Sequence, residues 1–272
     1  MGQLPYSTNN EAILDVWNAI FKQNSVSKKN LICAVLDGGG NFQKAGRAFT
    51  SESSAFTHWC ACHRLHLVTK CLFKKGPSIL KKIHEKANEI ASKIARSYQF
   101  SFTLKTQQQK LNLSKSVTQA TAIRWNSSFE MITSLVLNKE AIKETIKMEN
   151  LDNLSLNENE WYIMEFLSQW CEPITKSIIV LQADSKATID LVLVQLAILH
   201  FEAEKLLNAK PIRDQVNAHE VVNFKKSLGK ALQGALNTYF PKEERLYGAS
   251  SKKRFHLLVR DSIKNKELLL RI

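Results

Sequence analysis

The sequence contains no apolar segment long enough to cross a membrane. Its most apolar run, residues 191–201, is interrupted by Gln195 and falls short of the about 20 residues that a membrane-spanning helix needs. The amino terminus shows neither the apolar core of a secretory signal nor the features of a transit peptide. We therefore expect a soluble, intracellular protein that has no membrane partner.

A disulfide framework is also lacking. The chain has five cysteines at irregular spacings, Cys33, Cys60, Cys62, Cys71 and Cys171. Small secreted domains stabilised by disulfides usually carry an even number of cysteines at regular spacings. The cysteine pattern therefore favours a reducing compartment.

Acidic residues are outnumbered by basic ones. The chain holds 38 Lys and Arg against 25 Asp and Glu, which gives a net charge of +13. Such an excess favours an acidic partner, most commonly nucleic acid, although a lysine-rich surface that only aids solubility is the alternative. Part of the excess forms a loose basic field early in the chain: Lys22, Lys28, Lys29, Lys70, Lys74, Lys75, Lys81 and Lys82.

The first part of the chain has the pattern of an α/β unit. Thr8 and Glu11 have the spacing of a capping box ahead of an amphipathic helix. The continuous apolar run 31–36 predicts a fully buried strand, followed by a glycine-rich turn and a helix near 42–49. A second strand near 55–59 precedes a helix from about His63.

The rest of the chain is predicted to be helical. A stretch at 107–119 is expected to be a linker or mobile loop because it is polar. Ser127 with Glu130, and Asn157 with Glu160, have capping-box spacing, and Pro173 should kink or end the second of these helices. Helical apolar patterns lie at about 77–94, 127–146, 157–170, 187–207 and 221–236. The fold class is α/β plus all-α, predominantly helical.

Asp37 stands where the first predicted strand ends. In open α/β sheets ligands gather outside the carboxyl ends of strands, so a carboxylate there could hold a metal ion. The alternative is that Asp37 only opens a tight turn. Two-metal phosphoryl chemistry needs several converging carboxylates, and no second acidic residue ends a buried strand. Residues 38–40, all glycine, fit neither a Walker A loop nor a dinucleotide fingerprint.

Five possible metal ligands lie between residues 58 and 66: His58, Cys60, Cys62, His63 and His66. Thiolates and imidazoles suit zinc, but the spacing does not match a zinc finger and no second ligand pair follows. Cys60 and His63 are one helical turn apart, so a packed structural motif is the favoured interpretation over a zinc site.

Arg124, Trp125 and Asn126 come just before a predicted helix. An arginine beside a flat aromatic ring can hold a phosphate while a base stacks on the ring. The alternative is that Trp125 anchors the helix to the core. We find no serine or cysteine nucleophile with a companion base.

Three segments in this order resemble the hAT superfamily of DNA transposases. Residues 36–45 resemble the stretch in which an aspartate ends a strand before glycine or asparagine and then a lysine–alanine pair. Residues 60–68 resemble the family's cysteine-x-x-histidine motif, which runs into a leucine-rich helix. Residues 122–131 resemble its arginine–tryptophan–asparagine–serine motif, and Glu160-Trp161 opening a helix also fits.

The resemblance implies a ribonuclease H-like catalytic domain interrupted by a large helical insertion. Two aspartates and a glutamate bind divalent Mg or Mn in an intact family member. Asp37 matches the second aspartate, and Trp125, beside Arg124, matches the tryptophan that stabilises an extruded base. By this resemblance residues 1–126 form a partial ribonuclease H-like segment, and residues 127–272 form the helical insertion domain.

The sequence departs from the family at several points. By the resemblance, the first aspartate is expected upstream of residue 1, and the third carboxylate and the dimerisation region are expected after the helical insertion, near or beyond Ile272. We find no BED zinc finger in these residues, and Ile123 replaces the usual threonine. We therefore expect a truncated, catalytically inactive hAT-derived protein of the nucleus that needs no cofactor and binds DNA weakly and without sequence preference. Asp37 would bind metal only with partner carboxylates. Two alternatives stay open: an active DNA transposase whose sequence is incomplete, and a helical module in which residues 161–236 dock a protein partner.

Overall fold

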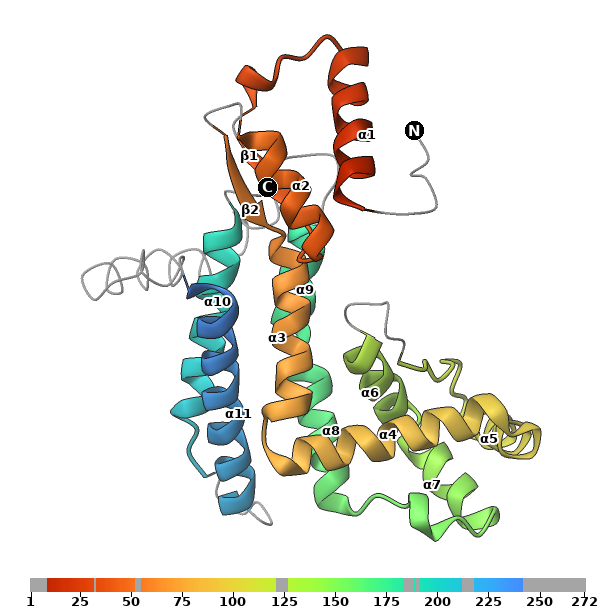
Figure 1. Ribbon diagram of the computed structural model, residues 1–272. Coiled ribbons are helices and arrows are strands. Elements are labelled where there is room, and N and C mark those ends of the chain that lie inside the picture. Colours follow the sequence, from red (N-terminus) through yellow and green to blue (C-terminus); the bar gives the residue numbers. More distant parts are fainter. Residues whose placement is uncertain are drawn as a thin grey trace. The chain divides into compact units, whose positions relative to one another are not determined.

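The computed structural model describes residues 9–31, 33–51, 55–120, 127–182, 188, 191–211 and 218–241 (Figure 1). The chain divides into two compact units, residues 1–64 and 65–272, and we treat each unit by itself. The predicted division after residue 126, between a partial ribonuclease H-like segment and a helical insertion domain, stays a prediction.

The first unit is a short α/β arrangement. Its elements are α1 (Asn10–Gln23), η1 (Lys28–Asn30), β1 (Cys33–Leu36), α2 (Gly40–Thr50), β2 (Phe56–Trp59) and the start of α3 (Ala61–Lys75). The two strands are parallel, with Cys33 opposite Phe56 and Leu36 opposite Trp59. Both predicted strands are thus confirmed, and α3 begins two residues before the predicted start.

A small aromatic core joins α1 to α2. The ring of Phe49 on α2 meets Trp17 and Phe21 of α1 edge to face, at centroid distances of 5.4 and 5.0 Å. Helix α1 is capped at its N-terminus by Asn9, whose side chain accepts a hydrogen bond from the N–H of Ala12. The predicted cap, Thr8, lies outside the described residues, and the capping position falls one residue later than predicted.

The prediction that the first strand is fully buried is wrong. Leu36 is buried, but Val35 is 56% exposed and Cys33 and Ala34 are half-buried. Alternate strand residues point to opposite faces, and α2 packs closely against the Leu36 side, where a Cβ on Gly46 would meet the leucine side chain. The opposite face, which carries Val35, is exposed.

The second unit consists of helices. Beyond α3 these are α4 (Ser78–Arg96), α5 (Tyr98–Lys110), α6 (Ser127–Leu137), α7 (Lys139–Met148), η2 (Asp152–Leu154), α8 (Glu158–Trp170), α9 (Glu172–Leu181), α10 (Leu191–Leu207) and α11 (Ala218–Tyr239). No strand follows Ser127 within the described residues, in agreement with the predominantly helical fold predicted from the apolar periodicity.

The polar stretch 107–119 is only partly a loop. Its first four residues belong to α5, a helix that the sequence pattern did not reveal, and Gln107 is buried. Gln107 and Gln108 find partners on other elements, since their side-chain amides donate to the sulfur of Met148 and to Asn138 Oδ1. Residues with polar side chains therefore continue the helix because tertiary contacts satisfy those side chains.

The predicted helix across 127–146 is broken in two at Asn138. Its fully buried side chain donates to the carbonyls of Ser134 and Lys115 and accepts from Gln108. Asparagine competes for backbone hydrogen bonds in this way and disfavours a helix interior, so α6 ends and α7 begins here. The capping box assigned to Ser127 and Glu130 stays a prediction, because the residues just before Ser127 lie outside the described part.

The start of α8 and the effect of Pro173 agree with the sequence, whereas α9 was not predicted as a separate helix. Asn157 and Glu160 form a complete capping box at the start of α8, and Pro173 lies in the first turn of α9 after α8 has ended. Helices α10 and α11 lie side by side (Figure 1). Gly229 permits this approach, since a Cβ there would lie 2.9 Å from the carbonyl oxygen of Ala203. No helix in the described residues has the length and apolarity to cross a membrane.

Candidate functional site

Asp37 connects β1 to α2. Its side chain is 55% exposed, and its Oδ1 accepts a hydrogen bond from the N–H of Gly39 at 3.1 Å. Its backbone carbonyl accepts from the side-chain amide of Gln43 at 2.7 Å. These contacts are those of a residue that opens a turn, the alternative that the sequence left open.

The structure brings Asp37 together with His63, two residues that the sequence assigned to separate motifs. His63 Nδ1 lies 3.2 Å from Asp37 Oδ1. The parallel register explains the pairing, because Leu36 lies opposite Trp59 and its carbonyl accepts from the N–H of Cys60 at 2.7 Å. The start of α3 is therefore held beside the carboxyl end of β1, and no local sequence signal could have shown this.

The histidines and cysteines of residues 58–66 do not converge on one point. In the part of the chain that the structure describes, no three side chains of His, Cys, Asp or Glu lie close enough to hold a metal ion together. The side chains separate instead: His58 Nε2 lies 3.1 Å from Nη2 of the buried Arg64, whereas His63 turns toward Asp37. The sequence did not single out Arg64.

Cys60 stands immediately before α3. The pKa of its thiol is lowered to about 6, chiefly because the Cys62 thiol donates a hydrogen bond to its sulfur. Burial acts in the opposite direction and raises the pKa. The backbone N–H groups of His63 and Cys62 and the charge of the nearby His63 lower it further. The pKa of the buried Cys62 is raised by that same hydrogen bond and by burial. A half-buried thiol at a helix N-terminus with such donors is the setting of a reactive cysteine.

The predicted DNA-binding residues Arg124 and Trp125 lie outside the described residues. Their role in binding DNA stays a prediction.

Exposed lysines gather where α3 ends and α4 begins. We call this group, Lys70, Lys74, Lys75, Lys81 and Lys82, the lysine corner. In the described part of the chain, only Lys81 and Lys82 have carboxylate neighbours, Glu85 and Glu160, each at the long distance of 3.8 Å.

Within the described ranges the other three lysines of the corner, Lys70, Lys74 and Lys75, have no carboxylate partner. Their positive charge is therefore not neutralised locally. A surface of this kind can meet successive phosphates of a nucleic acid.

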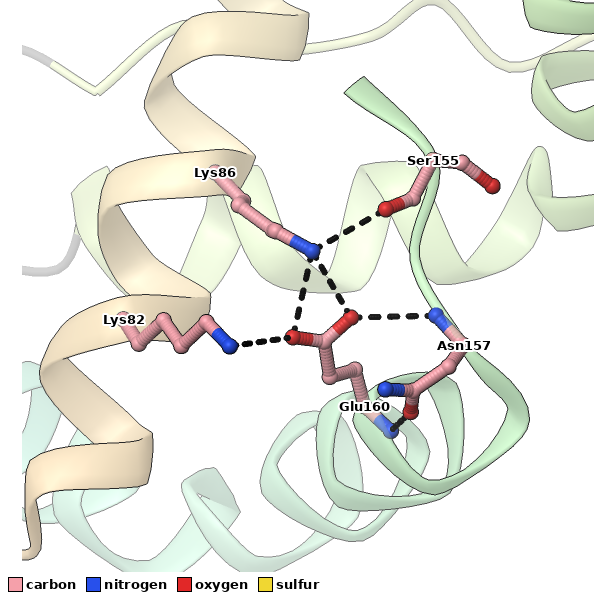
Figure 2. A network of polar contacts seen from close by, with 5 residues as sticks. All are labelled: Lys82, Lys86, Ser155, Asn157 and Glu160. Carbon is pink, nitrogen blue, oxygen red and sulfur yellow. Dashed lines mark hydrogen bonds and ion pairs between the residues drawn. The ribbon is translucent and has the colours of Figure 1, made fainter. Parts of the chain in front are cut away.

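A buried carboxylate, that of Glu160, joins α8 to α4 (Figure 2). The Glu160 side chain is 2% exposed, and its two oxygens accept from Lys86 Nζ at 3.2 and 2.9 Å. One oxygen also accepts from the N–H of Asn157 at 3.0 Å, while Lys86 donates further to the carbonyl of Ser155. Lys86 and Lys82 belong to α4, so Glu160 attaches α8 to α4 as well as capping α8.

Opposing effects set the ionisation of Glu160. Burial by itself would raise the pKa of this carboxyl, but the N–H of Asn157 and the ammonium groups of Lys86 and Lys82 outweigh burial and hold the pKa below its ordinary value. The carboxylate is thus charged and paired. The sequence predicted the cap but not the ion pair, because Lys86 lies in a different helix and no spacing rule connects the two.

In its described residues, the second unit thus contains helices and no strand, and it carries a basic corner. Comparison with known families agrees with this class: residues 59–170 match the family described as the ZBED1 RNase-like helical domain. The match begins at the end of β2 and ends with α8, so it contains the Cys60–His63 motif, the lysine corner and Glu160, while Asp37 lies outside it. Comparison of the chain with curated proteins finds none that matches.

Proposed function

We propose that this chain is a hAT transposase-derived protein of the nucleus that binds nucleic acid and does not cleave DNA by itself. The observation that carries the proposal is the match of residues 59–170 to the ZBED1 RNase-like helical domain. Two of the three sequence segments that resemble hAT transposases, residues 60–68 and 122–131, fall inside that match.

The lysine corner supports nucleic-acid binding. Its lysines are exposed and lie within the matched segment, and the chain as a whole carries a net charge of +13. Lysines that meet phosphates release condensed counterions, so binding through such a surface is steeply salt-dependent and tolerant of sequence. We therefore place the DNA contact at this corner.

The surroundings of Asp37 support the absence of cleavage. Its carboxylate already serves the turn through Gly39 and pairs with His63. A pair of metal ions that stabilises both the attacking and the leaving oxygen needs several carboxylates at one place. In the described residues, the carboxylate that the resemblance singles out, Asp37, contacts Gly39 and His63 and has no further carboxylate with it in a group that could hold a metal ion.

The test compares two pairs of lysines. Lys70 and Lys74 lie four residues apart on α3, and Lys226 and Lys230 lie four residues apart on α11; all four are exposed. The two double variants are Lys70→Glu/Lys74→Glu on α3 and Lys226→Glu/Lys230→Glu on α11. Both change the net charge by the same amount, so a difference in their DNA binding shows which surface contacts the duplex. Binding of a labelled 20-bp duplex is measured by fluorescence anisotropy over a range of salt concentrations.

We expect the α3 variant to bind the duplex on the order of 10-fold more weakly at low salt, with a log–log salt slope shallower by about 2. The affinity of the α11 variant for the duplex should fall much less. Equal losses in both variants would contradict the placement at the lysine corner, and a wild-type affinity unaffected by salt would contradict the proposed function.

A further inference from the structure

Helix α5 exposes two aromatic rings on one face. Tyr98 and Phe102 lie one helical turn apart and are 85% and 61% exposed. Their rings stack on each other, with centroids 6.2 Å apart and planes inclined by 21°. Two neighbouring exposed aromatic rings form an apolar patch of the kind that can mark a binding surface.

The aromatic face is held in place by the opposite side of the helix. Phe100, Leu104 and Gln107 are buried, and Thr103 Oγ1 donates to Glu149 at 2.6 Å. Ser97 caps the first turn through the N–H of Phe100. Because the helix is anchored from behind, the two exposed rings form a firm platform.

The charges around the platform are mostly positive. Helix α5 carries the exposed Lys105 and Lys110 and contains no acidic residue. Arg96, two residues before Tyr98, is exposed and lines a shallow depression of about 500 Å³ together with Lys93 and Glu89. Two carboxylates lie nearby in the described residues: Glu89 lines the depression, and Glu149 accepts from Thr103 of α5.

We infer that the α5 face of Tyr98 and Phe102 is a stacking platform for unpaired bases of single-stranded DNA. Every base has a flat π face that can stack on an aromatic ring, and the neighbouring cations can meet the phosphates of the same strand. Bases paired inside a duplex cannot reach such a platform, so it selects single strands. This inference rests on the proposed nucleic-acid binding and names a second contact, separate from the lysine corner.

The test uses the full chain and two labelled DNAs, a 20-residue oligothymidylate and a 20-bp duplex. The variant is Tyr98→Ala/Phe102→Ala. Ile179→Ala is the matched control, because Ile179 on α9 is also 61% exposed. Thermal unfolding of each variant checks that the exposed substitutions leave the fold intact, and Tyr98→Trp keeps a stacking ring in place.

We expect the double variant to bind oligothymidylate at least about 10-fold more weakly, since stacking contributes about 1–3 kcal/mol per base. Duplex binding should change less than about twofold, and Tyr98→Trp and Ile179→Ala should bind oligothymidylate like the wild type. A single strand containing 5-iododeoxyuridine should crosslink under ultraviolet light to the tryptic peptide 97–105.

The possible failures are distinguishable. If the wild type binds neither DNA, the proposed function falls and this inference falls with it. If the wild type binds the duplex but the double variant binds oligothymidylate as tightly as Ile179→Ala does, only the platform is overturned. Loss of self-association in the double variant, with unchanged single-strand binding, would overturn it in favour of a protein contact.

Discussion

At the scale of single residues, Cys60 and Asp37 show how the start of α3 sets local chemistry. Cys60 accepts hydrogen bonds from the Cys62 thiol and from backbone N–H groups of the first turn of α3. The Asp37 carboxylate accepts a hydrogen bond from the N–H of Gly39 and pairs with His63, which lies in the first turn of α3. The segment that resembles a metal site by its composition therefore contacts the end of β1, through the His63 side chain and the backbone N–H of Cys60.

We predict that Cys60 is the most reactive cysteine at neutral and mildly acidic pH. Thiolate is the reacting form, and the pKa of Cys60 is lowered to about 6, so alkylation by iodoacetamide should rise through pH 6 and level off above it. Burial raises the pKa of Cys33, and raises the pKa of Cys171 to about 11. Peptide mapping by mass spectrometry measures each site separately.

Cys60→Ser is the control, since it should remove the fast-reacting peptide and leave the slow ones unchanged. An alkylation midpoint for Cys60 near the ordinary thiol value of 9.0 would contradict the hydrogen-bonded thiolate.

At the scale of elements, the second unit is connected by polar residues as well as by apolar packing. Glu160 joins α8 to α4 through Lys86. Asn138 separates α6 from α7, and its side chain also donates a hydrogen bond to the carbonyl of Lys115, in the segment after α5. Lys139 Nζ of α7 lies 2.9 Å from Glu165 Oε1 of α8. The polar groups among these that are buried, Glu160 and Asn138, fix which helix meets which, because each needs a particular partner.

We predict that Glu160→Gln lowers the free energy of unfolding by about 2–4 kcal/mol at neutral pH. The substitution leaves Lys86 without its carboxylate in a largely buried setting, and breaking a buried pair from one side is costly. Glu165→Gln on the same helix is the control; its ion pair is more exposed, so its loss should stay below about 1 kcal/mol. Urea unfolding followed by circular dichroism measures both.

The pH dependence follows from the lowered pKa of Glu160. A carboxyl whose folded pKa lies below its ordinary value of 4.5 stabilises the fold above that pH, and this stabilisation is lost as the pH falls through the folded pKa. The difference in the free energy of unfolding between the wild type and Glu160→Gln should therefore become smaller as the pH falls through the folded pKa of Glu160. If the difference in the free energy of unfolding stayed constant from neutral pH to below pH 3, the charge of the carboxylate would contribute little to stability.

At the scale of the whole molecule, we predict that the purified chain does not cleave DNA. With Mn²⁺ and a terminal-repeat duplex it should give no nicks or hairpins, because magnesium and manganese keep most of their water unless several oxygen ligands compete for them. Asp37→Asn should then change only stability, through the turn and the contact with His63. Denaturing gel electrophoresis of the labelled duplex detects the products.

Cleavage by the wild type that disappears in Asp37→Asn would contradict this prediction. It would mean that further carboxylates join Asp37 when DNA is bound, and the alternative of an active transposase would be favoured. Asp15→Asn on α1 is a control for a general effect of removing one negative charge near the amino terminus.

The sequence by itself determined most of the elements. Local patterns were sufficient where a short-range rule operates: the apolar run before the glycines predicted β1, and Asn157 with Glu160 predicted the cap of α8. The same holds for Pro173, since its missing N–H ends α8 wherever the helix lies. These features depend on neighbours in the chain, which the sequence shows directly.

Only the tertiary structure decided what those elements meet. The pairing of Asp37 with His63 depends on the register of two parallel strands, and that of Glu160 with Lys86 depends on which faces of α4 and α8 pack together. The exposure of Val35, Tyr98 and Phe102, apolar residues that composition alone would place in a core, was likewise beyond a local rule. Burial and pairing depend on groups that are distant along the chain, so the charge state, reactivity and binding faces of this protein follow from its packing.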